Sequence, residues 1–157
     1  MKTALIMIAF AAMLIVSEGC NEEICKPTAW LMSGSNLDAV DNEIIGRVGI
    51  RNNDNIEFGA ESNWLGVKGE NQTFGGYVVA WLPIDPNNFE PYVGFDVTAG
   101  DVADGSFYGF LAGTAIRIGP IKSVVEYSNT QYSGQLADKY DHANDEHRVR
   151  AGLIFEF

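Results

Sequence analysis

Short apolar runs that alternate with polar residues dominate the chain beyond residue 25. Val, Ile, Phe, Tyr and Trp recur in short segments, and no stretch of residues 26–157 keeps the i, i+3, i+4, i+7 stripe of an amphipathic helix. Clusters of Gly, Pro, Asn and Asp separate these segments and favour turns. The pattern predicts strands at residues 28–35, 43–52, 56–64, 73–83, 89–100, 106–118, 121–128 and 146–157.

The predicted strands place apolar and polar side chains on opposite faces, because successive residues of a strand point to opposite sides. In the last strand one face holds Val149, Ala151, Leu153, Phe155 and Phe157, and the other holds Arg148, Arg150, Gly152 and Glu156, with Ile154 as the exception. A water-soluble sandwich with its apolar face inward has the same period. Alternation alone therefore leaves the orientation of the two faces open.

Three further features favour a barrel with a charged interior. Charged residues of both signs occur on several strands and would pair inside a narrow lumen: Arg47, Arg51, Glu57, Glu61, Lys122, Glu126, Arg148, Arg150 and Glu156. Glycines that would leave room for these long side chains are Gly49, Gly59, Gly76, Gly94, Gly109, Gly113 and Gly152. The final strand also ends on the aromatic Phe157 without a polar tail, which suits a strand that closes a barrel in lipid.

The predicted fold class is therefore all-β, an eight-stranded antiparallel up-and-down transmembrane β-barrel. Eight strands enclose only enough room for side chains, so we expect a plugged lumen and no general pore. The chain has 157 residues, which suits a single domain. Its 21 acidic residues outnumber its 10 basic residues, which excludes nucleic acid as a partner.

The N-terminus reads as an export signal. Lys2 precedes an uncharged stretch over residues 3–16, and small residues flank Glu18 just before Cys20. We predict a signal peptide at residues 1–19, a periplasmic tail at 20–27 and the barrel at 28–157. Cys20 and Cys25 leave three alternatives open, which are a disulfide, two free thiols or a lipidated Cys20.

The C-terminal sequence resembles the outer-membrane β-signal. Arg150, Gly152, Phe155 and Phe157 match its polar, glycine and two aromatic positions. The segment 91–94, Pro-Tyr-Val-Gly, also looks like the start of the fifth strand in OmpA, OmpX and opacity-type barrels. The resemblance implies a monomer in the bacterial outer membrane, in contact with lipid and lipopolysaccharide, that the barrel-assembly machinery inserts.

This resemblance also implies an orientation. With a periplasmic C-terminus, residues 53–55, 84–88 and 119–120 form periplasmic turns, and residues 36–42, 65–72, 101–105 and 129–145 form outer loops. Aromatic girdles would then lie at Trp30, Trp81, Phe89, Tyr92, Phe155 and Phe157 on the periplasmic side, and at Trp64 and Tyr127 on the outer side.

No catalytic, cofactor or metal site is predicted. His142 and His147 lie among acidic residues, but their spacing fits a solvated loop better than a zinc site. Barrels that deacylate lipid A carry His-x-Ser on a late strand, and here Glu126 stands two positions before Ser128, where that His would be. Palmitoyltransferase barrels need a His and a Ser near the outer rim, a role that Ser128 and His147 would have to fill.

The expected function is a structural or surface-interaction role, in adhesion or envelope integrity, through acidic outer loops. These loops or their edges contain Asp38, Asp41, Asp101, Asp104, Asp138, Asp141, Asp145 and Glu146. Their carboxylates would bind divalent cations shared with the phosphates of lipopolysaccharide, or would dock a basic partner protein directly. The alternatives are a lipid A-modifying enzyme and a soluble exported barrel that holds an apolar ligand, as lipocalins do.

Overall fold

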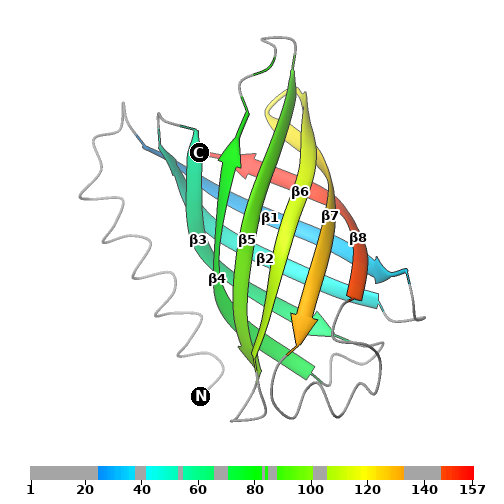
Figure 1. Ribbon diagram of the computed structural model, residues 1–157. Coiled ribbons are helices and arrows are strands. Elements are labelled where there is room, and N and C mark those ends of the chain that lie inside the picture. The colour runs from blue at the N-terminus through cyan, green and yellow to red at the C-terminus, as the bar shows by residue number, and fades with distance from the viewer. Residues whose placement is uncertain are drawn as a thin grey trace.

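A computed structural model describes residues 25–37, 42–52, 55–65, 71–82, 84, 88–100, 106–132 and 146–157. Eight strands make up almost all of these residues (Figure 1). They are β1 (Cys25–Asn36), β2 (Asn42–Asn52), β3 (Ile56–Leu65), β4 (Asn71–Trp81), β5 (Phe89–Gly100), β6 (Ser106–Ile118), β7 (Ile121–Tyr132) and β8 (Glu146–Glu156).

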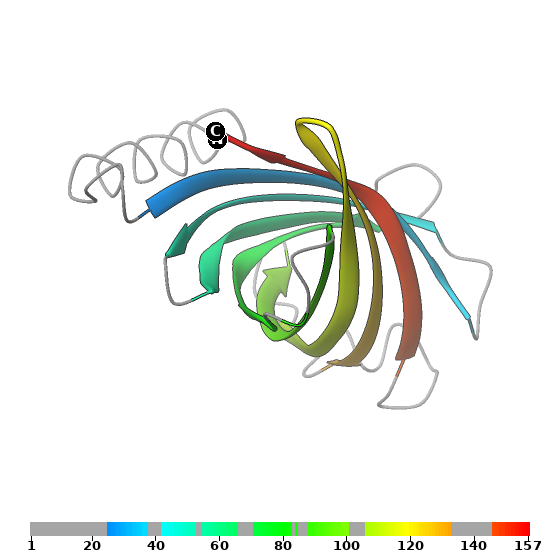
Figure 2. The ribbon, with the colours of Figure 1, turned by 90° about the horizontal axis from the view of Figure 1, so that it is seen from above.

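Each strand pairs antiparallel with its neighbour in sequence, and β8 pairs with β1 to close the barrel. The wall curves round on itself in both views (Figures 1 and 2). The predicted all-β class, with eight antiparallel strands in up-and-down order, is confirmed.

Tight reversals at one end of the barrel use left-handed backbone conformations. Gly119 has a φ of 65° in the turn between β6 and β7, where a side chain would be strained. Asn55 and Asn88 adopt φ values of 61° and 72° directly before β3 and β5, a conformation that Asn tolerates better than most residues.

The predicted strand boundaries agree closely with those of the structure. The predicted ranges 89–100 and 106–118 coincide with β5 and β6, whereas β7 runs on to Tyr132 and not only to residue 128. At the N-terminal side, β1 begins at Cys25, so residues 25–27 belong to the wall and not to a free tail. The expected signal peptide and Cys20 lie outside the described residues, and Cys25 is disulfide-bonded.

Among the residues that the structure describes, none forms a helix long and apolar enough to cross a membrane.

Candidate functional site: the charged lumen and the apolar outer wall

The two faces of the barrel wall differ completely in charge. The strand registers align Arg47 with Glu61, Glu126 with Arg150, and Arg117 with Lys122, so charged residues share the lumen face across neighbouring strands. On the outward face of the described strands, no position with a described side chain holds Asp, Glu, Lys or Arg.

Large hydrophobic side chains cover this outward face. Phe110 is 56% exposed and Leu31 is 57% exposed, although soluble proteins usually bury such residues. Other members, each about two fifths exposed or more, are Ile44, Phe58, Val78, Val93, Phe95, Val97, Ile116, Ile118, Val125, Val149 and Leu153. The apolar face of each strand therefore points outward, and the polar face points into the lumen.

An aromatic layer fills the lumen on the side nearer the tight turns, around the carboxylate of Glu57. The indole Nε1 atoms of Trp30 and Trp81 donate to Glu57 at 2.6 and 3.1 Å, and the Tyr77 hydroxyl donates at 2.7 Å. The Thr28 hydroxyl adds a bond of 2.6 Å. Because all of these groups are buried, the carboxylate fixes the orientation of both indoles.

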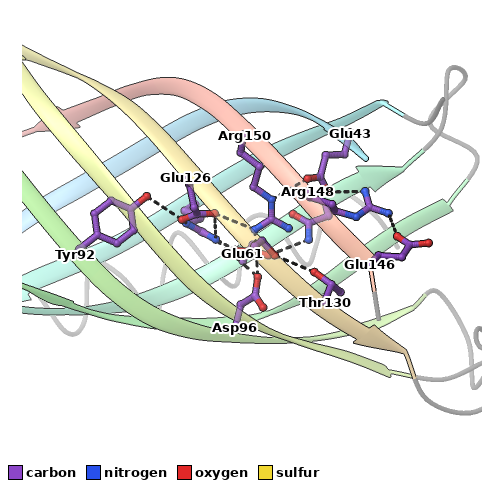
Figure 3. A network of polar contacts seen from close by, with 12 residues as sticks. Glu43, Glu61, Tyr92, Asp96, Glu126, Thr130, Glu146, Arg148 and Arg150 are labelled. Carbon is purple, nitrogen blue, oxygen red and sulfur yellow. Dashed lines mark hydrogen bonds and ion pairs between the residues drawn. The ribbon is translucent and has the colours of Figure 1, made fainter. Parts of the chain in front are cut away.

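A central ion network occupies the middle of the lumen (Figure 3). The Arg47 guanidinium binds Glu61 through Nε and Glu126 through Nη1, the latter at 2.6 Å. Arg150 binds the other Glu126 oxygen at 2.9 Å, and Asp96 lies 3.5 Å from Arg150 and 3.7 Å from Arg47. All five side chains are at most 1% exposed, so each charge depends on its partners.

Two further clusters lie on either side of the network. Towards the start of β8, Arg148 binds Glu43 at 3.1 Å and Glu146 at 2.6 Å. Towards the tight turns, Lys122 binds Glu90 at 2.7 Å and Glu156 at 2.5 Å.

The turn-side cluster also includes Arg51 and Arg117. Arg51 binds Glu90 at 2.7 Å and lies 4.5 Å above the Trp81 ring. Arg117 binds Glu156 at 2.6 Å. The structure thus brings the nine predicted interior charges together in the lumen, eight of them in ion pairs and Glu57 within the aromatic layer.

Five further members of these clusters were not among the predicted interior charges, namely Glu43, Glu90, Asp96, Arg117 and Glu146. Strict alternation along each strand supplies a signal for all five. Glu43 has the same parity as Arg47, and Arg117 has the same parity as Gly113. Glu90 and Asp96 have the same parity as Gly94, and Glu146 has that of Arg148, so the period of two places all five on the lumen face. The predicted girdle position of Tyr92 conflicts with the predicted interior position of Gly94, because both residues have the parity of Glu90.

The predicted aromatic girdles are partly wrong. Trp30, Trp81 and Tyr92 are at most 3% exposed and pack together inside the lumen, with ring centroids 4.8 to 5.7 Å apart. Their NH and OH groups find buried carboxylates there, which compensates for leaving water. Phe89 and Phe157, in contrast, lie on the outward face of the wall, where they are 44% and 77% exposed.

The glycine prediction also needs one correction. Gly76 alternates with the inward Tyr77 and faces outward, so it makes no room in the lumen. The lumen instead gains space at Gly34 and Gly75, which are not among the predicted glycines. A Cβ atom at Gly49 or Gly109 would lie 2.3 Å from Tyr77 Oη or Asp96 Oδ1, respectively.

The four residues of the predicted β-signal divide between the two faces of β8. Arg150 and Gly152 face the lumen, where a Cβ at Gly152 would lie 2.1 Å from the Leu31 carbonyl. Phe155 and Phe157 face outward, and the Phe157 amide donates to the Pro27 carbonyl of β1 at 3.0 Å. The last residue therefore extends the hydrogen-bonded junction between the first and last strands.

The candidate catalytic pair does not assemble. Ser128 faces the lumen and contacts Thr130 at 2.9 Å, whereas His147 lies on the outward face and contacts the Tyr127 hydroxyl through Nδ1 at 2.5 Å. The barrel wall separates the two side chains. His142 lies outside the described residues, and within the described residues no group of three or more His, Cys, Asp or Glu is arranged to hold a metal ion.

Neither a protein-family model nor a curated protein matches the sequence. Solved structures with a similar fold include a designed transmembrane β-barrel, with a TM-score of 0.66 and 15% identity over 84% of this chain and 95% of that one. The N-terminal β-barrel domain of Pseudomonas aeruginosa OprF has a TM-score of 0.62 and 10% identity, covering 84% of this chain and 97% of its own.

Neisserial surface protein A, NspA, has a TM-score of 0.58 and 14% identity over 85% of this chain and 96% of its own. At these identities the likeness establishes the fold alone. This chain has the fold of small transmembrane β-barrels.

Proposed function

We propose that this protein is a β-barrel of a bacterial outer membrane with a structural or surface-interaction role carried by its outer loops. The observation that supports a membrane location is the composition of the outer wall. Among the described side chains of the strands, no Asp, Glu, Lys or Arg faces outward. A lipid-facing arginine or lysine costs about 2–4 kcal/mol at the bilayer midplane, so such a wall suits hydrocarbon.

The lumen argues against the lipocalin-like alternative. A carrier of apolar ligands needs an apolar cavity, whereas this lumen holds buried ion pairs centred on Arg47 and Arg150. The lipid A-modifying alternative loses its Ser128 and His147 pair, because the two side chains lie on opposite faces of the wall.

Cell fractionation tests the membrane proposal. We expect the protein in the outer-membrane fraction, with faster gel migration before boiling than after it, because a closed barrel resists detergent unfolding. Recovery as a soluble periplasmic protein would overturn the proposal.

The surface role is expected to depend on the acidic loops, whose residues Asp38, Asp41, Asp101, Asp104, Asp138, Asp141 and Asp145 lie outside the described residues. Glu146 is expected at the outer rim, but it is the first residue of β8, points into the lumen and is 6% exposed. It therefore does not belong to the outer acidic set.

Replacing Asp138, Asp141 and Asp145 with Asn should leave membrane insertion intact but weaken adhesion or raise sensitivity to chelators, since carboxylates hold divalent cations. Insertion measured by heat-modifiable migration is the control. If the variant matches the wild type in adhesion, in chelator sensitivity and in detergent resistance, the surface role is contradicted.

A further inference from the structure

The junction between β1 and β8 is the only strand pair of the described barrel that joins the two ends of the fold. Residues Thr28–Asn36 of β1 pair with Arg148–Glu156 of β8. Backbone bonds extend this seam at both ends, from Leu37 to His147 at 2.8 Å and from Phe157 to Pro27 at 3.0 Å. Because the paired segments are far apart in sequence, closing this seam carries a large chain-entropy cost.

Side chains in the lumen cross this seam. Glu43 on β2 accepts a hydrogen bond from Arg150 Nε at 2.7 Å through one carboxylate oxygen, and it binds Arg148 at 3.1 Å through the other. Both arginines belong to β8, so these bonds join the two strands that flank β1. A longer contact of 3.5 Å joins Arg51 of β2 to Glu156 of β8 at the turn-side end.

Gly34 of β1 makes room for this crossing. It pairs with Glu43 on one side and with Arg150 on the other. A Cβ atom at Gly34 would lie 2.6 Å from Glu43 Oε1 and 2.9 Å from Arg150 Cγ. Any side chain here would therefore push the ion pair out of position.

We propose that Glu43, Arg148 and Arg150 form a clamp that holds the β1–β8 seam closed from inside the lumen. Their side chains are at most 5% exposed, so a movement of β8 away from β2 would leave charges buried without partners. Arg150 then has two separable roles, one in the clamp and one as the polar residue of the β-signal. Glu43 belongs to the clamp alone.

Hydrogen exchange measured by mass spectrometry on the purified folded protein tests the clamp. The variant is Glu43→Gln, and the matched control is Glu61→Gln, which removes an equally buried glutamate that binds Arg47 across β2 and β3. In Glu43→Gln we expect exchange over residues 28–36 and 148–156 to accelerate by about tenfold or more relative to wild type. In Glu61→Gln the acceleration should lie in β2 and β3.

A second variant keeps the carboxylate and disturbs only the crossing point. Gly34→Ala should accelerate seam exchange in the same way, whereas Gly46→Ala, whose new Cβ would lie 3.6 Å from the outward Trp64 ring, should not. If Glu43→Gln fails to fold, Gly34→Ala decides the question. Equal acceleration in all strands, or unchanged exchange at the seam in the folded variants, would overturn the clamp.

Discussion

Glu57 shows how single polar groups organise the lumen. Its carboxylate accepts bonds from Thr28, Trp30, Tyr77 and Trp81, all of them neutral donors. An ionised carboxylate can accept from all four, whereas an amide would turn its own NH2 group towards some of them.

We therefore predict that Glu57→Gln lowers the free energy of unfolding by about 1–3 kcal/mol, the cost of leaving buried donors unsatisfied. Urea unfolding of the barrel in bilayers, followed by tryptophan fluorescence, measures this loss. The emission of Trp30 and Trp81 should also change, because Glu57 fixes both indoles. Ser123→Ala, which removes a hydroxyl from the outward face of β7, serves as a control. Equal stability of both variants would contradict the role of Glu57.

At the scale of the element, β8 combines the predicted β-signal, lumen charges and the closing strand pair. Deleting Phe157 removes an outward aromatic ring that is 77% exposed and the backbone bond to Pro27. We predict a smaller inserted fraction in cells, because the terminal aromatic completes the predicted β-signal and this bond extends the seam. Phe89→Ala removes another outward aromatic and should insert normally, so unchanged insertion of the deletion would contradict the assignment.

Strands were predictable from the sequence because a period of two with turn clusters is a local signal. The sequence also predicts which face of β8 points outward, because Leu153 and Arg150 lie on opposite faces of the strand and differ in polarity. Trp30, Trp81 and Tyr92 were misplaced because an amphipathic ring suits a membrane interface as well as a carboxylate-lined interior. Which glutamate meets which arginine depends on barrel closure, so the Glu43 and Arg150 pair has no local signature.

At the scale of the whole molecule, the protein inverts the usual distribution of polarity. Charges that would be costly in hydrocarbon are paired in the lumen, as Arg47 is with Glu126, and apolar side chains such as Phe110 lie on the outside. Eight strands leave a lumen narrow enough for side chains to fill, and the central charges in it are at most 1% exposed. The central claim is that the outer wall faces lipid.

Cysteine labelling in intact membranes tests this claim most directly. Cys25 is disulfide-bonded and therefore offers no free thiol to the reagents. Single cysteines would replace three outward residues, Phe110, Ile116 and Val125, and their inward neighbours Leu111, Ala115 and Val124. All six are apolar, so no ion pair is broken. The account predicts that the outward positions react with a lipid-phase reagent and not with a membrane-impermeant one, while the inward positions react with neither. Ready reaction of the outward positions with the impermeant reagent would contradict it.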